Sequence, residues 1–153
     1  FDIVADKWEP VADAGNYAFN DAHAMMAFVG AGRRASAQRV IEAQNAAMMA
    51  EFSDNAAFTR EVGHPVALAI QNFGDGNYAE TMRQLRAVRN IAHRFGGSHA
   101  QRDILDLTMI EAAFRSGQHA LAKALSAERA LAKPSSPLAR LFVKRAAEMK
   151  QAA

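Results

Sequence analysis

The sequence contains no cysteine, and it has only four prolines, one tryptophan and two tyrosines among 153 residues. The absence of cysteine excludes a disulfide framework, a thiolate zinc site and a cysteine nucleophile. It is compatible with a reducing compartment, and we expect a cytoplasmic protein. The apolar runs are short and interrupted by charges, which predicts no membrane-spanning helix. The first ten residues, FDIVADKWEP, lack a signal-peptide pattern and an initiator methionine, so we expect a piece of a longer protein.

Neither sign of charge dominates, because 18 Lys and Arg side chains face 16 Asp and Glu side chains for a net charge of +2. Basic residues are nevertheless dense in two stretches, at Arg83, Arg86, Arg89 and Arg94 and at Arg140, Lys144, Arg145 and Lys150. The simpler interpretation is that each set is the solvated face of a helix. The alternative is a phosphate-binding stripe, which requires that the arginines converge with little acidic neutralisation.

Good helix formers dominate the composition, and strand patterns are scarce, so the sequence predicts an all-α fold. Helix-breaking residues divide the chain into segments of about ten to twenty residues. We expect breaks at Gly30–Gly32, Gly63–Pro65, Gly74–Gly76, Gly96–Gly97, Gly117 and Pro134–Pro137.

Three of these breaks form a repeat. A glycine is followed three positions later by alanine and preceded three positions earlier by a bulky apolar residue, in FVGAGRRASAQRV (28–40), NFGDGNYAETMRQL (72–85) and AFRSGQHALAKAL (113–125). The intervals between the turn glycines Gly32, Gly76 and Gly117 are typical of stacked helical hairpins. The predicted units are 19–52, 63–95 and 98–133. Bulky residues seven and three positions before each turn are expected to fill the hairpins: Met25 and Val29, Ala69 and Phe73, Ile110 and Phe114.

The C-terminal stretch predicts a capping helix over 136–151. Ser136 is a good N-cap residue, and Pro137 suits the first helical turn. Leu138, Leu141, Phe142 and Met149 form the expected apolar side, with Arg140, Lys144 and Glu148 on the polar side. A helix exposed on one face is what ends a helical array.

The stretch GGSHAQRD (96–103) has two interpretations. Ser98 and Gln101 match a capping box, with Asp103 near the positive end of the helix dipole. The alternative is an anion site built from free helix N–H groups with Arg102 and His99 beside them. At the preceding FNDAH (19–23), Asn20 or Asp21 is the expected helix cap, with His23 in the first turn.

No pattern in the sequence predicts catalysis. The five histidines lack the spacing of a helical zinc site, and no nucleophile elbow or phosphate-binding loop is present. Met25–Met26 and Met48–Met49 are best explained as core filling. We therefore expect neither an enzyme nor a bound metal or cofactor.

The chain resembles the C-terminal region of the tetratricopeptide repeat protein 38 family. The similarity is carried by FDIV (1–4), FNDAH (19–23), VGHP (62–65), GGSHAQRD (96–103) and the stretch from Glu128 to Leu138 that contains KPSSPL. The resemblance implies additional helical repeats upstream and a non-enzymatic scaffold, and it carries over no catalytic residue. The period is longer than the standard 34, and the aromatic residue expected after the turn glycine is present only as Tyr78, with Arg34 and His119 at the other two turns.

These patterns predict a helical-hairpin scaffold that binds protein segments, including the N-terminal repeats of its own parent chain, on a concave wall lined by the first helix of each pair. The candidate partner-binding residues are Asn20, His23, Gln71, Asn72, His99, Arg102 and Asp106. Three alternatives stay open. One is binding of single-stranded RNA or another nucleic acid through the arginine-rich helix 78–94. Another is an accessory role for an enzyme whose active site lies upstream. The third is a homodimer of the fragment through an exposed entry region at Trp8, Phe19 and Phe28.

Overall fold

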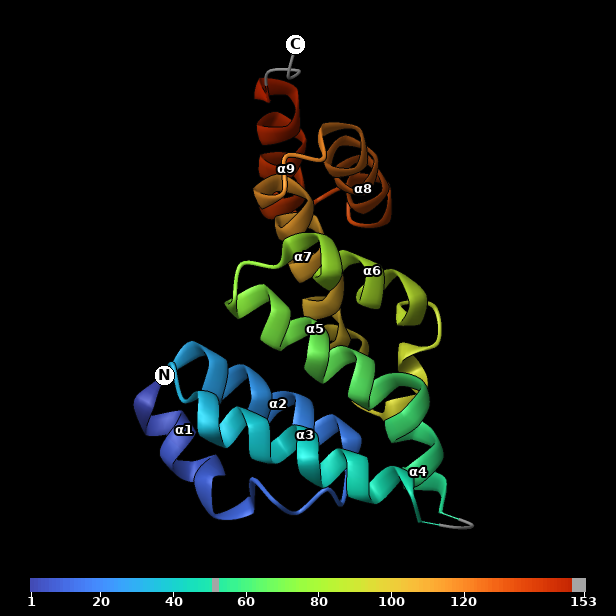
Figure 1. The fold of residues 1–153 in the computed structure, drawn as a ribbon. Coiled ribbons are helices and arrows are strands. Elements are labelled where there is room, and N and C mark those ends of the chain that lie inside the picture. Colours follow the sequence, from blue (N-terminus) through green and yellow to red (C-terminus); the bar gives the residue numbers. More distant parts are fainter. Residues whose placement is uncertain (51–52, 150–153) are drawn as a thin grey trace.

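The described part of the chain is all-α and consists of helical hairpins stacked along one direction (Figure 1). A computed structural model describes residues 1–50 and 53–149. The end of the first predicted unit (51–52), the end of the predicted capping helix (150–151) and Lys150 therefore lie outside the described residues. The α-helices are α1 (Asp2–Trp8), α2 (Ala18–Gly30), α3 (Arg34–Met48), α4 (Asp54–Phe58), α5 (His64–Gly74), α6 (Tyr78–Val88), α7 (His99–Arg115), α8 (His119–Ala132) and α9 (Pro137–Glu148).

The three turns predicted from the glycine–alanine repeat join α2 to α3, α5 to α6 and α7 to α8. The turn glycines Gly32, Gly76 and Gly117 have φ values of 70°, 81° and 68°. In each turn the residue after the glycine donates its N–H to the carbonyl five residues earlier, at 2.8, 2.8 and 3.1 Å. This bond closes a helix end in the Schellman geometry. The three hairpins therefore share one local mechanism of chain reversal.

The predicted break at Gly63–Pro65 is wrong, because the helix continues through it. A π-helical turn, Thr59–Gly63, joins α4 directly to α5. The N–H of His64 donates to the carbonyl of Thr59, five residues back, which widens the helix just before Pro65. Because proline normally clashes with the preceding helical turn, this wider turn explains how Pro65 fits near the start of α5.

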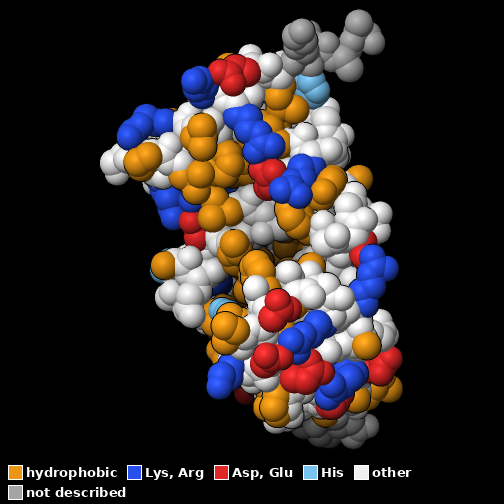
Figure 2. Space-filling model, turned by 90° about the vertical axis from the view of Figure 1, so that its left-hand side faces the viewer, with side chains coloured by type: hydrophobic (Ala, Val, Ile, Leu, Met, Phe, Trp, Pro, Cys, Tyr) orange, Lys and Arg blue, Asp and Glu red, His pale blue; other side chains and the backbone are white. Residues whose placement is uncertain are grey.

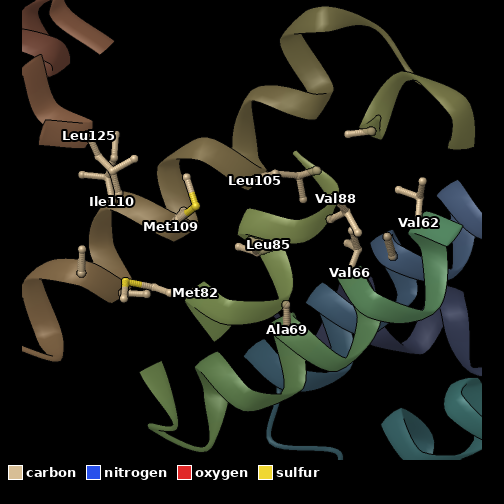
Figure 3. Packing of buried hydrophobic residues seen from close by; sticks show 14 of the residues in the cluster. Val62, Val66, Ala69, Met82, Leu85, Val88, Leu105, Met109, Ile110 and Leu125 are labelled. Carbon is tan, nitrogen blue, oxygen red and sulfur yellow. The ribbon is translucent and has the colours of Figure 1, made fainter. Parts of the chain in front are cut away.

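The hairpins stack because successive helices bury apolar faces against one another. Helix α5 packs against both α2 and α6, α6 packs against α7, and α8 packs against α9. One buried cluster runs from α2 to α9, and Figure 3 shows its central part on α5, α6 and α7. A second cluster joins α1, α2 and α3 around the fully buried Phe28 and Met25. Of the residues predicted to fill the hairpins, four are buried as expected (Met25, Ala69, Ile110 and Phe114), whereas Val29 and Phe73 are only partly buried.

The N-terminal segment is held against α3 by charge. Glu9, in a 3-10 helix (Glu9–Val11) after α1, accepts hydrogen bonds from Ser36 at 2.8 Å, Arg39 at 2.9 Å and Arg33 at 3.2 Å. Lys, Arg, Asp and Glu side chains gather on the lower part of the face in Figure 2, where α1 and α3 lie. The ion pairs explain why so short a helix has a defined position.

The two ends of the stack differ from their predicted surfaces. The predicted entry region is not exposed, since Phe28 and Phe19 are buried and Trp8 is partly buried; the exposed apolar residues there are Phe1, Ile3 and Val4.

At the other end, α9 begins as predicted, with Ser136 accepting from the N–H of Ala139. Its contact face is Ala139, Phe142, Ala146 and Met149, whereas Leu138 and Leu141 are exposed. The buried face of α9 is thus rotated from the predicted one, with Ala139 buried in place of Leu138.

No helix among residues 1–50 and 53–149 is both long and apolar enough to cross a bilayer.

The loop before α7 depends on two glycines that lie against aromatic rings. Gly96 and Gly97 have φ values of 97° and 75°, in the region that side chains with a Cβ resist. A Cβ at Gly97 would overlap the ring of Phe19, and one at Gly96 would overlap the hydroxyl of Tyr17. The loop is therefore both conformationally restricted and sterically closed onto the start of α2.

Substitutions at two glycines separate the backbone cost of a positive φ from the cost of steric overlap. We expect Gly117→Ala to lower the free energy of unfolding by about 1 kcal/mol, because only its positive φ is disfavoured and nothing lies within 4 Å of the new Cβ. Gly97→Ala carries the same backbone cost and also overlaps Phe19, so its expected loss is about 2–4 kcal/mol. Urea unfolding of both variants gives the comparison. Equal losses would contradict the steric role of Gly97.

Candidate functional site

A groove of about 460 Å³ lies between the first helices of the three hairpins. Helix α5 packs against both α2 and α7, so α5 forms its floor and α2 and α7 its walls. Hydrophobic side chains surround an indentation at mid-height on the face in Figure 2, where α2 and α5 end. The central lining is apolar and includes Phe19, Met26, Val66, Ile70, Ile104 and Leu105. The first helix of each pair thus lines one concave surface.

One end of the groove is built around the ring of Phe19. The Nδ1 atom of His23 is 2.8 Å from the carbonyl oxygen of Phe19, one turn earlier on α2, and the two rings meet edge to face at 4.5 Å. Phe19 also lies against Gly97, whose carbonyl accepts from Arg102. His23 and Arg102, predicted from widely separated stretches, therefore flank the same end of the groove.

The opposite end is built around Arg115, the last residue of α7. Its guanidinium lies over the rings of Phe73 at 5.1 Å and Tyr78 at 5.6 Å, and it donates to the Tyr78 hydroxyl at 3.3 Å. Its Nε also donates to Glu111 at 2.8 Å. The same carboxylate pairs with Arg145 of α9, so two cations share one anion at this end.

The structure confirms the capping box in GGSHAQRD. The Ser98 hydroxyl accepts from the N–H of Gln101 at 3.3 Å, and the Gln101 side chain accepts from the N–H of Ser98 at 2.9 Å. Arg102 turns back to donate to the carbonyls of Gly96 and Gly97. The stretch therefore ties the loop to the start of α7, and the capping box occupies the N–H groups of Ser98 and Gln101.

The predicted cap of α2 is wrong. Helix α2 begins at Ala18, and its N–H donates to the side-chain oxygen of Asn55 at 3.2 Å. The amide of Asn55 in turn donates to the carbonyl of Gly15 at 3.0 Å. The cap comes from α4 rather than from Asn20 or Asp21, because α2 begins at least three residues earlier than the pattern suggests, with Tyr17 at the N-cap position.

The remaining candidates do not converge on the groove. Asn20 and His99 are exposed, and His99 is 3.4 Å from Arg102. Gln71 lines a separate depression beside the start of α3. Asn72 donates to Gln84 at 3.3 Å and so faces α6. Asp106 lies on the opposite side of α7, 3.1 Å from Arg89, in a small polar cavity with Asp103 and Glu128.

The arginine stripe is extensively neutralised, contrary to the condition for phosphate binding. Arg83 pairs with Glu80, and Arg94 pairs with Glu61. Arg89 pairs with both Asp106 and Glu128. Apart from Glu80, the acidic partners come from other elements, so the stretch 78–94 alone does not reveal them. The predicted helix 78–94 is also wrong in extent, because α6 ends at Val88 and Arg94 lies in a separate 3-10 helix (Ala92–Phe95). Within the described residues, only Arg86 of the four is in no ion pair.

A buried polar chain links α2, α3 and α5. Gln44, which is fully buried, donates to Asp21 at 3.3 Å, and its amide oxygen is 3.3 Å from Nδ1 of His64. Burial raises the pKa of Asp21 to about 6, and the hydrogen bond from Gln44 only partly opposes it. Burial also lowers the pKa of His64. The two groups therefore favour their uncharged forms inside the stack.

A second ionic cluster fixes α7 to α8. Asp103 accepts two hydrogen bonds from Arg129, at 2.7 and 3.0 Å, and pairs with Lys133 at 3.0 Å. Hydrogen bonds from Arg129, followed by those from Lys133, lower the pKa of Asp103 to about 2. Asp103 was expected to interact with the helix dipole. In the structure its carboxylate forms a two-hydrogen-bond pair with the guanidinium of Arg129, which joins α7 to α8.

Sequence reasoning missed several groove residues on α7. They are Gln101, Ile104, Leu105, Thr108 and Arg115. Their spacing of three, four and seven places them on one face of a helix, and this periodicity was the available signal. Among the described residues, no cluster of three or more His, Asp or Glu side chains could hold a metal ion. No protein-family model matches the chain, and no solved structure matches it with statistical significance.

The raised pKa of Asp21 gives a prediction with a definite sign. Its native pKa of about 6 exceeds the ordinary value of 3.8, so protonation stabilises the folded chain, and this contribution is lost as the pH rises from about 4 to 6. We expect the free energy of unfolding of Asp21→Asn minus that of the wild type to be about 2–3 kcal/mol larger at pH 7.5 than at pH 4. Urea unfolding at both pH values measures this. A pH-independent difference would contradict the buried acid.

The lowered pKa of Asp103 predicts the opposite dependence. Its ionised form stabilises the native state above pH 4, and this contribution is lost as the pH falls toward 2. After allowance for solvent screening, we expect Asp103→Asn to lose about 1–2 kcal/mol at pH 7 and little at pH 2. Asp75→Asn is the control, because its partner Arg34 is 87% exposed and the pair should contribute less than about 0.5 kcal/mol. Equal losses from both variants at pH 7 would count against the Asp103 cluster.

Proposed function

We propose that this chain is a non-catalytic helical-repeat scaffold that binds a segment of another protein in the groove between α2, α5 and α7. The groove is the observation that supports this proposal most directly. It is apolar, open and lined by the first helix of every hairpin. Helical arrays present such concave surfaces to their partners. A bound segment would bury the central side chains and meet the polar groups at both ends.

The resemblance to the tetratricopeptide repeat protein 38 family belongs to the same proposal. Several of the stretches that carry it have a role in holding the stack together. FNDAH and VGHP meet inside the fold, where Asp21 and His64 both contact Gln44. GGSHAQRD provides the two glycines that lie against Tyr17 and Phe19, and it provides the capping box of α7. These roles support a scaffold rather than a catalytic assignment of the motifs.

Selection from a phage-displayed library of 16-residue peptides tests the proposed function. Ile104 lines the groove and is 40% exposed, so Ile104→Glu places a charge in the apolar centre without disturbing the buried core. We expect peptides selected on the wild-type chain to bind this variant at least about tenfold more weakly.

Leu131→Glu is the matched control, because Leu131 is 85% exposed on α8 and lies outside the groove. This variant should bind the selected peptides as the wild type does. Failure to enrich any peptide, or equal binding to Ile104→Glu, would show that the groove is not the binding site.

A further inference from the structure

The two charged side chains that line the groove within the described residues, Arg102 and Arg115, are both cationic. Arg102 lines one end and Arg115 the other, with His23 beside Arg102, and no Asp or Glu lines the groove within the described residues. Arg102 donates to backbone carbonyls and is in no described ion pair, so its positive charge is not neutralised. At the other end, Glu111 is shared between Arg115 and Arg145, which leaves an excess of positive charge. A partner with negative charge at both ends complements this arrangement.

The centre of the groove favours a helical partner. Between the two polar ends the lining is almost entirely apolar, and Thr108 supplies a hydroxyl there. An extended peptide would bring backbone N–H and C=O groups into this lining with few partners, which is costly. A helix satisfies these groups internally and needs only an apolar face.

The length of α7 sets the spacing between the two cations. Arg102 and Arg115 are thirteen residues apart on one helix, which corresponds to about 20 Å along its axis. A partner helix lying along the groove would need carboxylates a similar number of residues apart. An arginine guanidinium has five N–H donors, so both arginines retain donors for a carboxylate beyond those used within the chain.

This inference rests on the function proposed above. We propose that the groove binds an amphipathic α-helix that has an apolar face and a carboxylate side chain near each end, about thirteen residues apart. One carboxylate would contact Arg102 and the other Arg115. The partner is thus an acidic, helical protein segment.

Three synthetic 18-residue peptides test this inference by fluorescence anisotropy. All carry the same leucine stripe at helical spacing, and they differ only at two positions fourteen residues apart, nearly four turns and so on one side of the helix, which hold Glu, Gln or Lys. We expect the Glu peptide to bind the wild-type chain about tenfold or more tightly than the Gln peptide, with the Lys peptide weakest. Raising the salt concentration should reduce the difference.

Arginine substitutions assign the effect to the two ends. Arg102→Gln and Arg115→Gln should each weaken binding of the Glu peptide about fivefold and leave the Gln peptide unchanged. Arg102→Lys should retain most of the affinity because it keeps the charge. Arg86→Gln is the control, since Arg86 is exposed on α6 outside the groove. Thermal unfolding of each variant verifies that it is folded.

Equal affinity for the Glu and Gln peptides, or an equal effect of Arg86→Gln, would overturn the acidic-helix inference. Absence of binding by all three peptides would overturn it as well. The proposed function is decided separately, because the library selection makes no assumption about the charge or conformation of the peptide.

Discussion

The close approach of α2 and α5 is the constraint on which the groove depends. Glycines at both ends of α5 permit it. A Cβ at Gly63 would lie 2.6 Å from the Cβ of Ala18, and one at Gly74 would overlap the side chain of Val29. A side chain at either glycine would therefore force the two helices apart at that end. Because α5 is the floor of the groove and α2 one of its walls, this packing also fixes the width available to a partner.

The local parts of the fold were predictable, whereas parts that depend on distant residues were not. The hairpin turns and the capping box are determined by residues within one helical turn of each other, so their sequence patterns were sufficient. The capping of α2 by Asn55 joins residues 37 positions apart, and no local pattern indicates it. The π-helical turn likewise overrode the usual effect of Gly63 and Pro65 on a helix.

The same distinction separates the site residues. His23 and Arg102 were identified from local stretches and lie at the groove, but Asp106 points to the far side of α7. Arg89 and Arg94 look unopposed along the stretch 78–94 and gain carboxylate partners only when the helices pack together. Helical periodicity indicates which residues share a face. Which neighbour covers that face depends on the packing of the whole stack.

The π-helical turn at Thr59–Gly63 also sets the angular register between the two ends of a continuous helix. Each residue in an α-helix advances the direction of the side chains by about 100°. Deleting one residue from this turn would restore ordinary α-helical winding with little net rotation, because the wider turn accommodates one extra residue, whereas deleting one residue between Asn55 and Thr59 would rotate Asn55 by that amount relative to α5. Asn55 would then point away from Ala18, and the start of α2 would lose its cap. The angular register of Asn55 across the π-helical turn thus links α4 to the wall of the groove.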